Sequence, residues 1–193
     1  MAVIDSTKKE INFKIVYYGP AESGKTTTLQ ELHSSVKSKK KSEVTKASKT
    51  ERTIFFDFLA LKSDSIGGYK TRFQVYTVPG QPLYEDSRRL LLKGVDGIIF
   101  VADAQLDRIQ DNLNSLEELK VLLHEMGYTP QEIPMVIQLN KVDLPNIPPI
   151  DELRKAINIF HVPDFETIAT TGSGVHDAFR ECVRQVLMTL KDL

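Results

Sequence analysis

The residues near the start of the chain that are best suited to chemistry form a glycine-rich loop. Residues 19–26 read Gly-Pro-Ala-Glu-Ser-Gly-Lys-Thr and match the pattern G-x-x-x-x-G-K-[ST]. In this pattern backbone N–H groups surround phosphate oxygens, the lysine reaches the β- and γ-phosphates, and the hydroxyl ligates Mg²⁺. The residues expected to contact a nucleotide here are Gly19, Glu22, Ser23, Gly24, Lys25, Thr26 and Thr27. The pattern predicts a nucleotide-phosphate site, against the alternative of an accidental strand–turn–helix.

A second motif indicates which base the nucleotide carries. Residues 140–143 read Asn-Lys-Val-Asp and directly follow the apolar run 135–139. A carboxylate at Asp143 can accept hydrogen bonds from the ring N–H and the exocyclic amine of guanine together, a pair of donors that adenine lacks. Four residues alone are a weak pattern. Their combination with a phosphate loop in the same predicted sheet favours a guanine nucleotide.

Both motifs need a sheet to bring them together, and the hydrophobic pattern predicts one. Strands are expected over 11–18, 54–61, 69–78, 98–102, 135–139 and 165–169, and helices over 26–36, between 82 and 93, and over 109–126, 150–158 and 175–190. This alternation predicts an α/β fold: a mostly parallel six-stranded sheet with one antiparallel edge strand and helices on both faces. Ligands are expected at the carboxyl ends of the parallel strands. The lysine-rich stretch 37–52 lacks periodicity and is expected to be a mobile loop.

Composition narrows the class of protein further. The chain has 193 residues, which predicts a single domain over 1–193, and its formal net charge of -1 argues against a nucleic-acid partner. One cysteine excludes an internal disulfide and suits a reducing compartment. No apolar run reaches the roughly 18 residues of an integral membrane segment. We therefore expect a cytoplasmic protein.

With these motifs in place, the chain resembles a small Ras-type GTPase over essentially its whole length. Residues 16–20, 51–53, 55–59 and 76–81 narrow the resemblance to the MglA family of bacterial gliding-motility and cell-polarity GTPases. The resemblance implies a P-loop small GTPase fold and a molecular switch that binds GTP with Mg²⁺ and hydrolyses it slowly to GDP and phosphate. It also implies a roadblock-type activating partner, MglB, effectors that bind the GTP state, a monomer when free, and recruitment to a cell pole or membrane by partners.

The resemblance assigns catalytic roles to residues outside the phosphate loop. Thr53 would ligate Mg²⁺ when a γ-phosphate is present, Gly80 would read that phosphate through its amide, and Gln81 would orient the attacking water. Arg52 resembles an arginine that is carried within the GTPase and swung in by a partner, the alternative being a solvated loop residue. Together with Lys25 it would stabilise charge on the transferring phosphoryl group.

The resemblance also assigns the residues around the base. Asn140 would tie the base loop to the phosphate loop, and Lys141 would pack along the base. Asp143 would fix guanine, and Ala169 would offer its amide to the guanine oxygen.

Two positions depart from the Ras pattern. Thr77 stands where Ras-type chains carry an aspartate before the glycine, a change shared by the MglA family. It removes a carboxylate near Mg²⁺, so weaker magnesium dependence of nucleotide affinity is expected. Ala21 stands where a glycine is common beside the γ-phosphate, and its methyl group is expected to slow hydrolysis without abolishing it.

Two other functions remain open at this point. One is a nucleotide-dependent binding module with little or no hydrolysis, which Thr77 and Ala21 favour and Gln81 opposes. The other is a P-loop ATPase or kinase, which Asp143 opposes.

Overall fold

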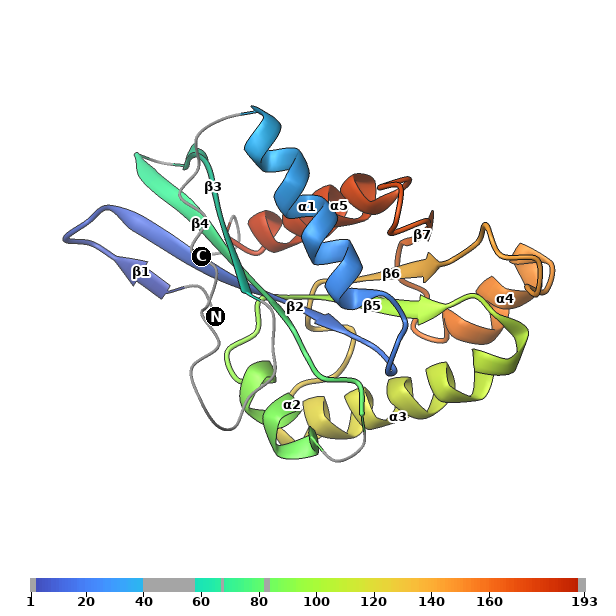
Figure 1. The fold of residues 1–193 in the computed structure, drawn as a ribbon. Coiled ribbons are helices and arrows are strands. Elements are labelled where there is room, and N and C mark those ends of the chain that lie inside the picture. Colours follow the sequence, from blue (N-terminus) through green and yellow to red (C-terminus); the bar gives the residue numbers. More distant parts are fainter. Residues whose placement is uncertain (1–2, 40–57, 67, 82–83, 191–193) are drawn as a thin grey trace.

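The secondary structure follows the predicted alternation of strands and helices. The computed structural model describes residues 3–39, 58–66, 68–81 and 84–190, and Figure 1 shows the arrangement of its elements. The strands are β1 (Val3–Asp5), β2 (Glu10–Tyr18), β3 (Phe58–Ile66), β4 (Tyr69–Thr77), β5 (Gly97–Asp103), β6 (Met135–Asn140) and β7 (Asp164–Thr167). The helices are α1 (Lys25–Lys39), α2 (Glu85–Leu92), the 3₁₀ helix η2 (Leu106–Arg108), α3 (Ile109–Glu125), α4 (Ile150–Ile157) and α5 (Val175–Met188).

The strands form one sheet in the order β3-β4-β2-β5-β6-β7, with β1 paired to β2 off this path. The pairings from β4 through β7 are parallel, and β3 pairs antiparallel with β4. The predicted six-stranded, mostly parallel sheet is therefore confirmed. The short strand β1 was not predicted; it pairs antiparallel with residues 10–12 of β2, on the flank that β5 leaves open because β5 pairs with β2 only from Ile15.

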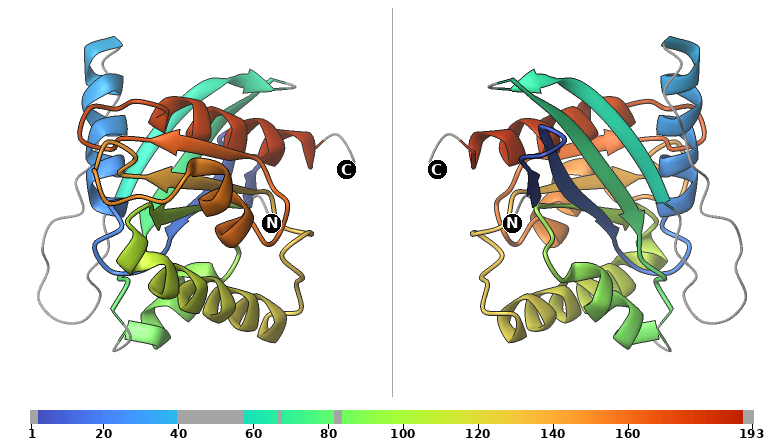
Figure 2. Two further views of the ribbon diagram at one scale, coloured as in Figure 1. Left: turned by 90° about the vertical axis from the view of Figure 1, so that its right-hand side faces the viewer. Right: turned by 90° about the vertical axis from the view of Figure 1, so that its left-hand side faces the viewer.

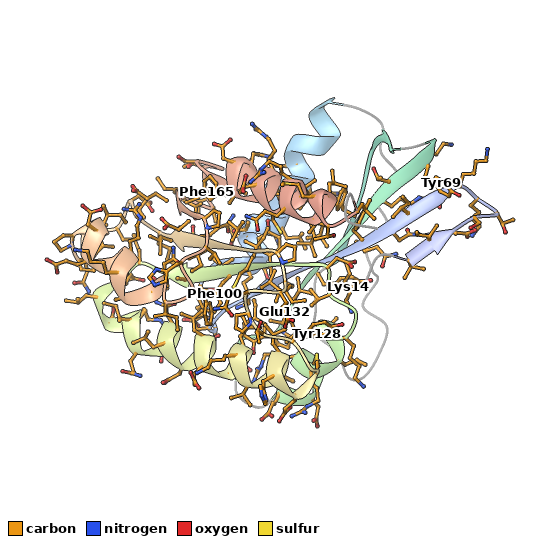
Figure 3. The ribbon with its side chains drawn as sticks, turned by 180° about the vertical axis from the view of Figure 1, so that it is seen from behind. Lys14, Tyr69, Phe100, Tyr128, Glu132 and Phe165 are labelled. Carbon is orange, nitrogen blue, oxygen red and sulfur yellow. The ribbon has the colours of Figure 1, made fainter. Side chains whose placement is uncertain are left out.

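Helices cover both faces of the sheet (Figures 1 and 2), so its central strands are apolar on both sides. Every residue of β5 is buried. Along β2 the side chains alternate, because successive residues of a strand point to opposite faces. Val16 and Tyr18 pack with α2, α3 and α4, whereas Ile15 and Tyr17 pack with α1 and α5. Phe100, labelled in Figure 3, belongs to the first of these two layers.

Three predicted boundaries need correction. The strand expected over 54–61 continues to Ile66, because its pairing with β4 extends to Ile66 opposite Tyr69 although residues 62–65 are polar; residues 54–57 lie outside the described residues. Residues 37–39, expected in the mobile loop, extend α1, and 40–52 lie outside the described residues. The last strand ends at Thr167, because beyond it the N–H of Ala169 donates at 3.0 Å to the side chain of Asn140, the last residue of β6, and not to the backbone of that strand.

Among the described residues, no helix is both long enough and apolar enough to cross a membrane.

Candidate nucleotide-binding site

The two sequence motifs lie at the same edge of the sheet. Residues 19–24 connect β2 to α1, and residues 141–143 follow β6; both loops leave the carboxyl ends of parallel strands, as Figure 1 shows. The loop after β7 joins them there, because Lys141 N–H donates to the Thr167 carbonyl at 3.0 Å. This edge is where α/β sheets bind ligands.

The phosphate loop has the backbone that close approach to an anion requires. Gly24 adopts φ +103 just before α1 begins at Lys25, and the loop ends with the first bond of the helix, from Thr28 N–H to the Gly24 carbonyl at 2.9 Å. The preceding N–H groups at this helix end have no partner within the helix and carry its positive dipole, an arrangement that favours an anion. Ser23 is fully buried and Thr26 is exposed.

Lys25 lies folded over this loop. Its ammonium donates to the carbonyls of Gly19 at 2.9 Å and Pro20 at 2.6 Å. Burial, and then the nearby positive charge of Arg88, lower the pKa of Lys25 to about 8. Phosphate oxygens placed here would accept hydrogen bonds from the same ammonium and raise its pKa again, because a nearby negative charge favours the charged form.

Asn140 joins the base motif to the phosphate loop. Its buried side chain donates from Nδ2 to the Ser23 carbonyl at 2.8 Å, and its Oδ1 accepts from Ala169 N–H at 3.0 Å and Thr167 Oγ1 at 3.2 Å. A Cβ at Gly24 would lie 2.2 Å from this Nδ2, so only glycine leaves room for the amide. One side chain thus fixes three loops relative to one another.

Ala169 lies at this junction of loops. Its N–H donates to Asn140 Oδ1 at 3.0 Å, and Ala169 is 5% exposed. The expected contact of this amide with a guanine oxygen stays a prediction. Asp143, by contrast, is exposed at the edge.

Two charged residues of the site were missed by sequence reasoning. Asp103 is fully buried at the end of β5, pairs in register with Asn140, and accepts from Lys141 Nζ at 2.6 Å. Arg108 donates to the Ala21 carbonyl at 2.7 Å and forms ion pairs with Asp111 at 2.6 Å and Asp103 at 3.9 Å. The sequence did offer one indication of Asp103, because this aspartate directly follows the apolar run 98–102, at the edge where ligands are expected. It offered no indication of Arg108.

The glycine after β4 lies directly on the phosphate loop. A Cβ at Gly80 would be 2.3 Å from the backbone N of Ala21 and 2.5 Å from the carbonyl carbon of Pro20. Gln81 follows it and is exposed, while Thr77 is buried at the end of β4. Arg52 and Thr53 lie outside the described residues.

Comparison with known proteins identifies the family. The model of the ADP-ribosylation factor family matches residues 1–186. The "Mutual gliding-motility protein MglA" of Myxococcus xanthus (strain DK1622) is 48% identical over 192 residues, covering 99% of this chain and 98% of the relative. The chain belongs to the MglA type of small GTPase, within the ADP-ribosylation factor family.

More distant relatives are similar to this MglA-type chain over most of its length. The "ADP-ribosylation factor-like protein 6" of Caenorhabditis elegans is 25% identical, covering 93% of this chain and 88% of the relative. The "Ras-related protein Rab7" of Cenchrus ciliaris is 27% identical, covering 94% and 85%. The resemblance inferred from the motifs is confirmed, and with it a GTP- and GDP-binding switch.

Of the two residues expected to bind Mg²⁺ in this MglA-type site, the structure describes Thr26. Among the described residues, no group of three or more His, Cys, Asp or Glu could hold a metal ion. Mg²⁺ takes few protein ligands and completes its octahedron with phosphate oxygens and water. The exposed hydroxyl of Thr26, beside Lys25, is a ligand of the required chemistry.

Proposed function

We propose that this MglA-type GTPase binds GTP and GDP with Mg²⁺ and hydrolyses GTP slowly alone and faster with a roadblock-type partner, MglB. Effectors that recognise its GTP state would then control bacterial cell polarity and gliding motility, with recruitment to a cell pole or membrane. The main support for a nucleotide site is the hydrogen bond from the Asn140 side chain to the Ser23 carbonyl, which holds the phosphate loop against the base motif. The motility role is carried over from the Myxococcus relative, whose name states it.

Each group in the proposed mechanism has a defined task. The loop amides and Lys25 hold the β- and γ-phosphates, and Asp143 accepts from guanine while Asn140 keeps the loops in register. Thr26 and Thr53 would hold Mg²⁺, which would supply positive charge to the phosphates. Gln81 orients the attacking water, and Gly80 donates its amide to the γ-phosphate.

Single-turnover hydrolysis of preloaded GTP tests the switch, with and without an MglB-type partner. We expect a rate on the order of 10⁻⁴ s⁻¹ alone, and an increase of roughly 10³- to 10⁵-fold with the partner if an arginine enters the site. Replacing Gln81 by alanine should lower the stimulated rate roughly 10²-fold, because the water loses its orientation. Gln131→Ala, at an exposed position on a distant loop, is the matched control.

Each alternative has its own outcome in this assay. GTP that stays intact although the partner binds would favour a binding module without turnover. Displacement of bound guanine nucleotide by excess ATP would favour an ATPase or kinase. A stimulated rate that survives Arg52→Ala would remove Arg52 from the mechanism.

Replacing Ala21 by glycine should raise the single-turnover rate severalfold. The backbone of Ala21 already contacts Gly80 and Arg108, so its methyl group adds bulk to a crowded turn beside the proposed γ-phosphate position. Chromatography of GDP formed with time measures the rate. An unchanged rate would show that the methyl group does not crowd the reacting groups.

A further inference from the structure

Arg88 is an unusually buried arginine in the helix that follows Gly80. It lies in α2, and its side chain is 3% exposed. A guanidinium cannot lose its proton in a protein, so burying it is costly unless several acceptors surround it. Its neighbour Arg89, on the same helix, instead forms ion pairs at the surface with Glu85 and Glu125.

Two of the acceptors around Arg88 are backbone carbonyls that flank Gly80 in the sequence. Its Nη1 donates to the Pro79 carbonyl at 3.1 Å and to the Gln81 carbonyl at 2.6 Å. Its Nε donates to Glu118 Oε1 on α3 at 3.1 Å, and Nη2 donates to the same oxygen. The guanidinium therefore clamps the turn at 79–81 to α3.

The clamp extends to the strand that supports the phosphate loop. The hydroxyl of Tyr18, the last residue of β2, donates to Glu118 Oε2 at 2.9 Å. Tyr18 immediately precedes Gly19, the first residue of the phosphate loop. Arg88, Glu118 and Tyr18 thus connect the turn at Gly80 with the loop at Gly19 by hydrogen bonds.

Peptide geometry gives this clamp a direct effect on the Gly80 amide. The Pro79 carbonyl and the Gly80 N–H belong to one peptide unit, which is trans, so the two groups point in opposite directions. Holding the carbonyl on Arg88 turns the N–H away from Arg88. Gly80 itself lies on the backbone of the phosphate loop, against Ala21.

We propose that Arg88 is a positioning residue for GTP, which sets the direction of the Gly80 amide and the backbone of Gln81 through its bonds to the flanking carbonyls. This inference rests on the proposed function. Glu118 and Tyr18 act through Arg88 by fixing its guanidinium. Because GDP lacks the γ-phosphate that the Gly80 amide would read, the clamp affects GTP binding and hydrolysis and leaves GDP binding unchanged.

Arg88→Met tests the proposal, because methionine fills similar space without donors. We expect the single-turnover rate of GTP hydrolysis to fall roughly 10²-fold, as for a misplaced reacting group. The preference for GTP over GDP should fall roughly 10-fold, as for the loss of one hydrogen bond to a charged phosphate. GDP affinity should stay within a factor of about two, since the phosphate loop is intact.

Three further variants sharpen the result. Arg88→Lys should restore part of the rate, because an ammonium can reach one carbonyl but cannot span both carbonyls and Glu118. Tyr18→Phe removes a single hydroxyl and should lower the rate and the GTP preference by smaller factors; it keeps the test valid if Arg88→Met does not fold. Arg89→Met should behave as the unmodified protein.

Two results would overturn the inference. One is an Arg88→Met protein whose hydrolysis rate and GTP-to-GDP affinity ratio both equal those of the unmodified protein. The other is an equal loss of GDP and GTP affinity, which would mean that Arg88 only maintains the fold. If the unmodified protein itself fails to hydrolyse GTP, the proposed hydrolysis fails, and the affinity ratio still decides the role of Arg88.

Discussion

Asp143→Ala should lower the affinity for GDP and for GTP by roughly 10²- to 10⁴-fold, because two hydrogen bonds to a charged acceptor are lost at about 1.5–3 kcal/mol each. The loss should be equal for both nucleotides, since the carboxylate touches only the base. Asp143 is exposed in the structure, so its removal leaves the core and the Asn140 junction unchanged. The melting temperature without nucleotide should therefore stay the same.

Titration of the protein with fluorescent GDP measures this loss. Glu152→Ala, which removes an exposed carboxylate from the first turn of α4, is the control and should bind as the unmodified protein does. Excess ATP should compete better against guanine nucleotide in Asp143→Ala than in the unmodified protein. An affinity that stays within a few-fold in Asp143→Ala would mean that Asp143 is not a base contact.

Gly24→Ala should reduce both stability and nucleotide binding. The backbone at φ +103 disfavours any side chain, and the new Cβ would lie 2.2 Å from Asn140 Nδ2. We expect the free energy of unfolding to fall by roughly 2–5 kcal/mol, from backbone strain and the lost buried hydrogen bond to Ser23. GDP affinity should fall as well, because the loop and the base motif lose their common anchor. Urea unfolding and GDP titration measure the two effects.

The chain offers a control that separates strain from crowding. Gly127, which follows α3, has φ +82, and a Cβ there would meet nothing within 4 Å. Gly127→Ala should therefore lose only the strain, about 1–2 kcal/mol, and bind GDP normally. Equal losses of stability in the two variants would show that Asn140 moves aside without cost.

The features that sequence predicted well are local in the chain or repeat along one element. The phosphate loop spans eight consecutive residues, and the apolar spacing of Leu116, Leu119 and Leu123 predicted α3 within one residue of its observed ends. β5 was recognised because a strand buried on both faces reads as one apolar run.

The features that were missed depend on residues far apart in the sequence. Arg108 meets Ala21 across 87 positions, and Arg88 meets Glu118 across 30. A charged residue on a helix is ordinarily exposed, and no pattern distinguishes the buried Arg88 from the exposed Arg89 beside it. β1 was missed for a different reason: three residues are too few for an alternation to be recognised.

The position of α5 has a consequence for how the chain folds during synthesis. Val175, Ala178, Cys182 and Val186 are fully buried beneath the central strands, and α5 is the last element of the core to leave the ribosome. Until it emerges, the face of β5 and β6 that it covers stays open, and parallel strands of distant sequence cannot close their core. Nascent chains that end before residue 175 should depend on chaperones, and the phosphate loop should bind nucleotide stably only after translation of α5 is complete.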